Sequence, residues 1–416
     1  KGTLTINAGS ITTQNDIDNA GTLVLNAGTL ESNVVGSGNT QINTAGTVTN
    51  SASIANSIEV VTGTFANAGN VTGDLTIDAG ATASQSTATA SLGAVSNAGT
   101  FELSAGTVAS IINTSNANGV SQTGGTVTGD VTNSGSYTIS TGSVGGTFSN
   151  SGTFNFNGGT VAKYNQSGGD LVIANGAGMS FTDATNTITG GNVTLGSTSP
   201  ASIGSITFNN GLNTNAAAIT TNGASGLTII GGSEFTTLAG SNVGSDAVVT
   251  LGDTSTTGKL NIGAGSVVLG ANDIWTANGT VNVTSGTLEL AGVTQNGTFS
   301  QTGGTLNITA NQTLGANASV SGANVTIGGG NTLYLNTGSS MSLDGGSDLS
   351  NVNWAGNIQL DGGSLVLAKI VDQTRVTGTD PYNKTGKLTA NTGNLTINSS
   401  NVLLGANDYI ADDVVV

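Results

Sequence analysis

The fold is decided by Gly2-Thr3-Leu4-Thr5-Ile6-Asn7-Ala8-Gly9-Ser10-Ile11, a stretch that returns 19 residues later as Gly21-Thr22-Leu23-Val24-Leu25-Asn26-Ala27-Gly28-Thr29-Leu30. Further copies of this pattern begin at Gly99, Gly135, Gly152 and Gly279. Repetition at a spacing of about 19 residues is the sequence signature of a solenoid, in which each repeat forms one structural unit. The sequence therefore predicts a stack of similar coils.

Each copy reads Gly-Thr-Φ-x-Φ-(Asn/Ser)-x-Gly-Thr-Φ, where Φ is an apolar residue. Leu4 and Ile6 fall on one face of a strand, because strand side chains alternate between two faces. The Asn-x-Gly step predicts a corner, since both residues tolerate the left-handed backbone of a sharp bend. We expect an all-β fold, a parallel β-helix (β-solenoid) of about 19 residues per coil and roughly 20 stacked coils.

A single coil buries too little apolar surface to offset the conformational entropy lost when its residues are ordered. Stacked coils share a continuous core and pair their backbones on both sides. Threonine, serine and asparagine at equivalent positions are expected to form ladders of like residues inside or outside the stack.

Composition excludes most catalytic chemistry. The 416 residues include no histidine and no cysteine, which removes His-based triads, His-ligated zinc and thiolate nucleophiles. Seven Lys+Arg stand against 23 Asp+Glu, a net charge of −16, so there is no basic footprint for nucleic acid. We assign no catalytic residue, no metal and no cofactor, and we expect that the chain is not an enzyme.

The alternatives to a β-solenoid fit less well. Charged residues make up only 7% of the chain, which is too few for amphipathic helices. Hydrophobic residues make up 36% and are regularly spaced, and there are only two prolines, so a disordered chain is not expected. The sequence contains no run of eighteen apolar residues, so no transmembrane segment is predicted. Because the chain begins in mid-pattern, we expect a mature product or a fragment of a longer protein.

Most of the basic residues gather in one segment. Residues 369–387 contain Lys369, Arg375, Lys384 and Lys387, together with Tyr382. We predict a loop that projects from the coils and contacts a partner; the alternative is an ordinary insertion or a junction between blocks of coils. The expected organisation is therefore a β-solenoid over 1–368, an irregular insertion or junction over 369–390, and further coils over 391–416.

Acidic residues beside glycines form a second group of candidates. They are Asp344-Gly345-Gly346-Ser347-Asp348, Asp361-Gly362-Gly363, and Asp273 and Asp408 in two Gly-Ala-Asn-Asp corners. Such turns can ligate Ca²⁺, but the repeated calcium nonapeptide is missing, so solvated turns are the preferred interpretation. A carboxylate pair could also hydrolyse glycosidic bonds, yet nothing in the linear sequence selects one pair.

Two further patterns have a functional and a structural interpretation. Trp275 and Trp354 could stack on sugars, although cover for a solenoid end or a bent coil is the preferred interpretation. Threonine pairs such as Thr3/Thr5 and Thr47/Thr49 resemble an ice-binding array, but Thr22 is followed at the same spacing by Val24. The broken array favours β-propensity as the reason for the threonines.

Residues 19–30 and the later Gln301-Thr302-Gly303-Gly304-Thr305-Leu306 resemble the passenger regions of bacterial autotransporters and of two-partner-secreted exoproteins. The resemblance is one of composition and repeat style and covers nearly the whole chain. It implies a right-handed parallel β-helix that is exported unfolded and serves adhesion, aggregation or biofilm formation. It supplies no fixed site motif, so no binding residue is carried over.

These features together predict an extracellular or bacterial cell-surface adhesin that makes many weak contacts. The expected partners are surface glycans, host or sibling cell surfaces, and other copies of the chain. The alternative is a module that polymerises into a filament, sheath or surface layer, because open solenoid ends expose strand edges. A polysaccharide-degrading enzyme and an ice-binding protein are less favoured.

Overall fold

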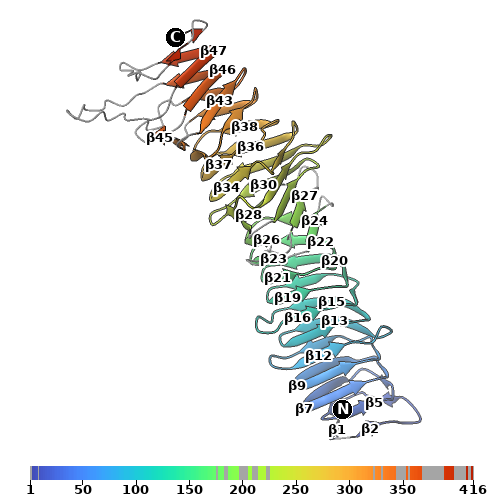
Figure 1. Cartoon of the computed structure of the whole chain (residues 1–416). Coiled ribbons are helices and arrows are strands. Elements are labelled where there is room, and N and C mark those ends of the chain that lie inside the picture. The colour runs from blue at the N-terminus through green and yellow to red at the C-terminus, as the bar shows by residue number, and fades with distance from the viewer. Residues whose placement is uncertain are drawn as a thin grey trace, which may run out of the picture. The chain divides into compact units, whose positions relative to one another are not determined.

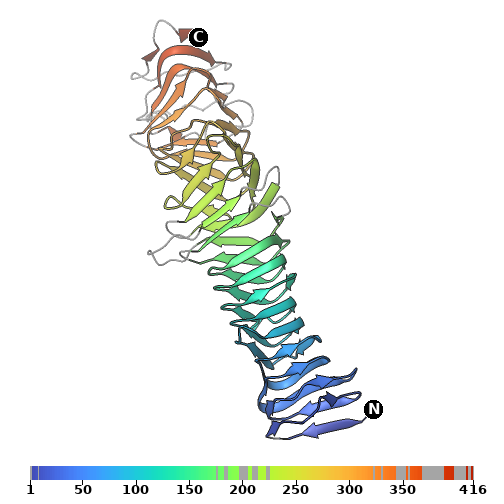
Figure 2. The ribbon, with the colours of Figure 1, turned by 90° about the vertical axis from the view of Figure 1, so that its right-hand side faces the viewer.

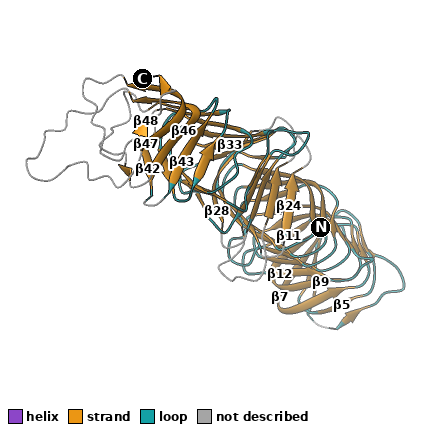
Figure 3. Ribbon diagram, turned by 45° about the horizontal axis from the view of Figure 1, so that its top comes forward, coloured by secondary structure: helices purple, strands orange, loops and turns teal. Residues whose placement is uncertain are grey.

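The chain folds as a parallel β-solenoid. A computed structural model describes residues 2–7, 9–174, 177–181, 186–195, 205–208, 214–221, 225–321, 324–328, 331–342, 353–354, 357–367, 388–397, 409–410 and 414–415. Within these ranges every element is a strand, paired strands lie about 19 residues apart, and about 16 turns are formed. The ribbon drawn by secondary structure shows only strands and loops (Figure 3). The predicted fold class is therefore confirmed.

Two compact units divide the chain. Unit 1 comprises residues 1–179 and 185–194, and unit 2 comprises residues 180–184 and 195–416. β24 (Gly178–Phe181) spans the division. The predicted insertion at 369–390 lies almost entirely outside the described residues, so the predicted domain organisation stays a prediction.

In unit 1 each coil visits three faces in turn (Figure 1). Face 1 contains β1 (Thr3–Ile6), β4 (Thr22–Leu25), β7 (Asn39–Asn50), β9 (Ser57–Asn67), β11 (Leu75–Ile77), β13 (Ser91–Asn97), β15 (Thr107–Asn113), β18 (Val131–Asn133), β20 (Ser143–Asn150), β22 (Thr160–Gln166) and β25 (Thr187–Ile188). Long strands such as β7 and β9 bend from one face to the next, and each half pairs separately with its neighbours.

The other two faces of unit 1 are built in the same way. Face 2 contains β2 (Ser10–Ile11), β5 (Gly28–Leu30), the second halves of β7 and β9, β12 (Thr82–Gln85), β14 (Thr100–Leu103), β16 (Val120–Gln122), β19 (Ser136–Ile139), β21 (Thr153–Phe156), β23 (Asp170–Ile173) and β26 (Asn192–Leu195). Face 3 contains β3 (Ile17–Asp18), β6 (Val34–Val35), β8 (Ser53–Ile54), β10 (Asn70–Val71), β17 (Thr126–Val127) and the first halves of β13, β15, β20 and β22.

Unit 2 also has three faces, named here after one strand of each (Figure 2). The β32 face holds β27 (Ser205–Phe208), β29 (Gly226–Ile229), β32 (Val248–Leu251) and β35 (Ile274–Trp275). The β33 face holds β28 (Thr214–Thr221), β30 (Ser233–Thr237), β33 (Gly258–Ile262), β36 (Gly279–Val283), β38 (Thr298–Gln301), β41 (Ala318–Ser321) and β44 (Ser340–Ser342). The β34 face holds β31 (Asn242–Val243), β34 (Ser266–Gly270), β37 (Thr287–Ala291), β39 (Thr305–Ile308), β42 (Asn324–Ile327) and β45 (Asn353–Trp354).

The last described strands of unit 2 continue the parallel pairing. They are β40 (Gln312–Leu314), β43 (Thr332–Asn336), β46 (Asn357–Leu367), β47 (Leu388–Ile397), β48 (Tyr409–Ile410) and β49 (Val414–Val415). β43 pairs with β46, and β46 pairs with β47.

Alternation along each strand separates core from surface. In β4, Leu23 and Leu25 are each 1% exposed, and the residues between and before them face outward. Buried aromatic rings pack together in the unit 1 core, where Phe148 and Phe154 lie with ring centroids 4.1 Å apart. The Φ-x-Φ motif therefore supplies two core side chains to interior strands such as β4, whereas Leu4 of β1, in the first described coil, is 55% exposed.

Glycine alone makes the left-handed corners. Gly106, Gly125, Gly142 and Gly159 stack in successive coils with φ of +76°, +62°, +92° and +84°. A Cβ at Gly142 would lie 2.5 Å from the carbonyl oxygens of Gly124 and Gly125, so a side chain is excluded. The prediction that asparagine shares this conformation is wrong, because every positive φ in the described ranges belongs to a glycine.

Asparagine has a different role, which is to form a hydrogen-bonded ladder inside unit 1. Nδ2 of each residue donates to the side-chain oxygen of the next over 2.8, 2.7, 2.8 and 3.5 Å; the series is Asn97, Asn113, Asn133, Asn150 and Gln166. These five side chains are at most 2% exposed. A shorter ladder joins Asn50 to Asn67 and Asn67 to Gln85, each over 2.9 Å. The predicted ladders of like residues therefore occur in the core.

Candidate functional site on the β33 face

The basic segment proposed as a partner contact cannot be placed. Lys369, Arg375, Tyr382, Lys384 and Lys387 all lie outside the described residues. The prediction that this segment contacts a partner therefore stays a prediction.

The acidic corners have mixed outcomes. Asp344, Asp348 and Asp408 lie outside the described residues, whereas Asp361-Gly362-Gly363 forms part of strand β46, at a shift in its register with β43, and is not a turn. In the described part of the chain, no group of three or more acidic residues is placed to hold a metal ion.

Asp273 lies in a turn as the sequence predicts, but its carboxylate is partly buried and hydrogen-bonded rather than solvated. Its backbone N–H donates to the Gly270 carbonyl over 3.1 Å, and its two carboxylate oxygens accept from the N–H groups of Gly270 and Val249, each over 2.6 Å. Val249 belongs to the preceding coil, so the carboxylate joins two coils. Burial raises the pKa of Asp273, and the two backbone hydrogen bonds oppose that shift.

Trp275 is part of the core. The side chain is 2% exposed, its Nε1–H donates to the Gly279 carbonyl over 3.1 Å, and its ring meets Phe299 edge to face at 5.9 Å. Sugar stacking on Trp275 is therefore excluded, and the ring packs inside the core rather than covering a solenoid end. For Trp354 only the backbone, in β45, is described.

At the described threonine pairs, the two-column array of an ice-binding surface is not formed. Thr3 pairs with Thr22, but Thr5 pairs with Val24. Thr47 pairs with Thr64, whereas Thr49 pairs with Ala66. At these positions the register confirms that the array is broken.

Instead, single columns of small polar residues run along the outer surface. On face 3 of unit 1, seven residues follow one another in register: Ser53, Asn70, Ser91, Thr107, Thr126, Ser143 and Thr160. Neighbours in this column bond directly, as Ser91 to Asn70 over 3.1 Å and Thr126 to Ser143 over 3.0 Å. Because successive strands lie about 4.8 Å apart, the column is a regular array of hydroxyl and amide groups.

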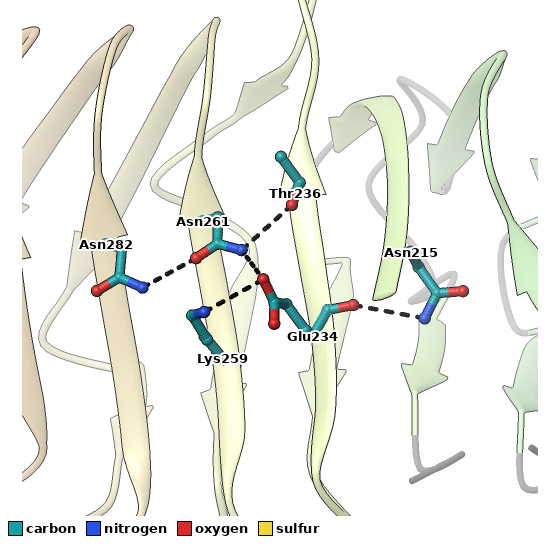
Figure 4. A network of polar contacts seen from close by, with 6 residues as sticks. All are labelled: Asn215, Glu234, Thr236, Lys259, Asn261 and Asn282. Atoms are coloured by element: carbon teal, nitrogen blue, oxygen red, sulfur yellow. Dashed lines mark hydrogen bonds and ion pairs between the residues drawn. The ribbon is translucent and has the colours of Figure 1, made fainter. Parts of the chain in front are cut away.

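The β33 face carries the most developed polar cluster in the described chain. Alternation in β30 and β33 turns Phe235 and Leu260 inward and leaves the side chains on either side of them facing out. Register then places five outward residues on three neighbouring strands, and we name them the β33 row: Glu234, Thr236, Lys259, Asn261 and Asn282 (Figure 4).

Glu234 and Asn261 connect the β33 row. Lys259 Nζ lies 3.3 Å from Glu234 Oε1 and forms the one ion pair found among the described residues. Asn261 Nδ2 donates a hydrogen bond to the same oxygen. Asn261 Nδ2 also donates to Thr236 Oγ1 over 3.2 Å, and Asn282 Nδ2 donates to Asn261 Oδ1 over 3.0 Å (Figure 4). The side chains of Lys259 and Glu234 are 40% and 27% exposed, so this ion pair adds little stability to the fold and both groups are accessible to solvent.

A hydrogen-bonded loop precedes β33 in the chain. It runs from Gly252 to Thr257 and ends directly before Gly258, the first residue of β33. Asp253 accepts from the N–H groups of Ser255 and Thr256 over 2.7 and 2.6 Å and from Thr256 Oγ1 over 2.6 Å. The loop is also tied to the next coil, since Asn278 Nδ2 donates to the Asp253 carbonyl over 2.9 Å.

The β33 row is not visible as a cluster of charges along the chain, because Glu234 and Lys259 are 25 residues apart. The available signal was the alignment of Ser233-Glu234-Phe235-Thr236, Gly258-Lys259-Leu260-Asn261 and Gly279-Thr280-Val281-Asn282. Superposing these copies places Glu234 and Lys259 in one column and the two amides, Asn261 and Asn282, in the column beside it.

We expect Asp253 to stay ionised far into the acid range. Hydrogen bonds from the Thr256 side chain and from the N–H groups of Ser255 and Thr256 lower its pKa to about 2 from 3.8. Carboxyl ¹³C shifts followed by NMR from pH 7 to pH 3 should show little protonation of Asp253. The lowered pKa favours the folded loop above pH 3.8, and this contribution is lost as the pH falls toward 2.

A matched pair of variants separates the causes of this shift. Thr256→Val removes the largest one and should raise the Asp253 pKa toward 3.8. Ser255→Ala removes only the smallest one, the 3.1 Å hydrogen bond from Ser255 Oγ, and should leave the pKa nearly unchanged. Half-protonation of Asp253 near pH 4 in the unsubstituted protein would contradict the hydrogen bonding described above.

The class of protein is set by the fold: a parallel β-solenoid repeat protein. No protein-family model, no curated protein and no solved structure matches the chain. Among the described residues, no helix has the length and apolar character needed to cross a membrane. The resemblance to autotransporter-type passengers therefore rests on repeat style alone.

Proposed function

We propose that the protein is an extracellular or bacterial surface-displayed β-solenoid that mediates adhesion and cell aggregation through many weak contacts. The observation that carries this proposal is the outward column of seven serine, threonine and asparagine residues on face 3 of unit 1. Such columns repeat one chemical group in every coil, and repeated weak contacts add up to high avidity when geometry lets them engage together.

The electrostatic properties of the chain agree with this function. A net charge of −16 keeps single copies apart at low ionic strength, because the Debye length is then long. Side-chain hydrogen bonds join several carboxylates to neighbouring coils, for example Glu59 to Gln41 over 2.8 Å and Asp170 to Asn192 over 2.7 Å. When salt screens the repulsion between negatively charged copies, the short polar groups on their surfaces can come into contact.

Display on a non-aggregating bacterium tests the proposal. Cells that carry the chain should settle or adhere faster than cells that carry a truncated display scaffold, and more so at 0.15 M than at 0.01 M salt. Equal settling and equal adhesion of both strains would contradict the proposal. Filaments seen by electron microscopy of the purified chain would instead support the polymerising alternative.

Face 3 supplies a residue-level test of the same function. Ser91→Lys, Thr107→Lys and Thr126→Lys together place long cations in the column without touching the core. We expect aggregation to fall strongly because the hydroxyl array is interrupted. The matched control is Thr5→Lys, Gln41→Lys and Thr76→Lys on face 1, where the outward positions do not form a uniform hydroxyl column.

A further inference from the structure

The β33 row has hydrogen-bonding capacity that its internal contacts leave unused. Glu234 Oε1 is shared by Lys259 and Asn261, but no hydrogen bond within the described residues reaches Glu234 Oε2 or Asn282 Oδ1. The ammonium of Lys259 has three N–H donors, and its one contact here is with Glu234. Glu234 and Lys259 are in register on β30 and β33, about 4.8 Å apart, and Asn282 on β36 lies two residues further along, in register with Asn261, so acceptors and a donor occupy two neighbouring columns.

Charge restricts what can bind there. Lys259 is the one cation of unit 2 that the structure describes, and Glu234 neutralises it at 3.3 Å. The chain as a whole carries −16, so polyanions are repelled rather than attracted. The complementary ligand is therefore an uncharged molecule in which each polar group both donates and accepts, as a hydroxyl group does.

The β33 row is also held in place before any ligand arrives. Asn261 is fixed by Glu234, Thr236 and Asn282, and the loop that precedes Lys259 is closed by the Asp253 carboxylate. Groups that are already ordered lose little entropy on binding, which raises affinity without any new contact.

We propose that the β33 row binds a neutral, hydroxyl-rich glycan chain that lies across β30, β33 and β36. Glu234 Oε2 and Asn282 Oδ1 accept from sugar hydroxyls, and Lys259 Nζ donates to them. This site rests on the proposed adhesive function and assigns to it a ligand class and a location.

Affinity electrophoresis of the intact chain tests this site. Native gels contain a neutral β-glucan, a neutral galactomannan or the polyanion alginate, and migration is compared with a gel that lacks polysaccharide. At least one neutral polymer should retard the protein, and alginate should not. The double variant Asn261→Ala/Asn282→Ala should bind about tenfold more weakly, because two hydrogen-bonding amides are removed.

The matched control removes two outward amides from another face. Asn307→Ala/Asn324→Ala lies on β39 and β42 of the β34 face and should migrate like the unsubstituted chain. Circular dichroism confirms that both double variants keep their strands. The site is overturned if neither neutral polymer retards the chain, if the β33 variant is retarded like the unsubstituted chain, or if alginate is the polymer that binds.

These outcomes are separable from failure of adhesion itself. If the β33 variant loses glycan retardation but displayed cells still aggregate, aggregation depends on the outward columns of unit 1. If glycan retardation is absent and aggregation persists, the site is wrong while the proposed function stands. If glycan is bound by the β33 row but displayed cells neither settle nor adhere, the function is wrong and the site stands.

Discussion

Replacing Trp275 with alanine is expected to lower the free energy of unfolding of unit 2 by about 3–5 kcal/mol. The side chain is 2% exposed and is the largest among the fully buried ones, so its removal leaves a large cavity beside Phe299. The Gly279 carbonyl also loses its donor, the indole N–H at 3.1 Å. Urea denaturation followed by circular dichroism measures the change.

Trp275→Phe is the control for this prediction. It keeps an aromatic ring against Phe299 and removes the indole N–H together with part of the volume, so the expected loss is smaller, about 1–2 kcal/mol. If Trp275→Ala costs less than about 1 kcal/mol, the ring is not the packing element described here.

Asn133→Ala is expected to destabilise unit 1 by about 3–4 kcal/mol. Asn133 is the centre of the buried ladder: it accepts from Asn113 over 2.7 Å and donates to Asn150 over 2.8 Å and to the Thr153 carbonyl over 3.0 Å. Without it, the Asn150 and Thr153 acceptors on the next coil lose this donor and the Asn113 amide on the preceding coil loses this acceptor, and unsatisfied buried polar groups are costly.

Two further variants identify the cause. Asn133→Leu keeps the branched shape of the side chain and fills its space but forms no hydrogen bonds, so it should remain destabilised if the ladder is responsible. Asn155→Ala removes an outward asparagine that donates to Thr138 Oγ1 over 3.3 Å, and it should cost less than about 1 kcal/mol. A small cost for both Asn133 variants would show that the ladder contributes little.

Much of the fold could be predicted from the repeat. Leu23 and Leu25 are buried as the Φ-x-Φ spacing indicates, and Gly28 has the left-handed φ that the corner needs. The role of asparagine could not be predicted in full, because one sequence repeat does not reveal which way a corner side chain points. Asn113 and Asn133 point into the core, whereas Asn26 and Asn7 bond to each other outside it.

The site was less accessible to sequence reasoning than the fold. Clustering along the chain selected residues 369–387, whereas Glu234 and Lys259 are 25 residues apart and meet because their strands pair. At Asp361 a local pattern was misleading: Asp-Gly-Gly predicted a turn, whereas the residue lies in strand β46, which pairs with β43.

The sequence by itself determined that this protein is a β-solenoid, which side chains alternate into its core, and that chemistry based on histidine or cysteine is excluded. These properties follow from residue types and their spacing, both of which are local. Only the tertiary structure decided which residues face each other across coils: the asparagine ladder, the burial of Trp275, the broken threonine array and the β33 row. The physical reason is that coil lengths vary, so the register between coils is fixed by packing and backbone pairing rather than by any constant offset in the sequence.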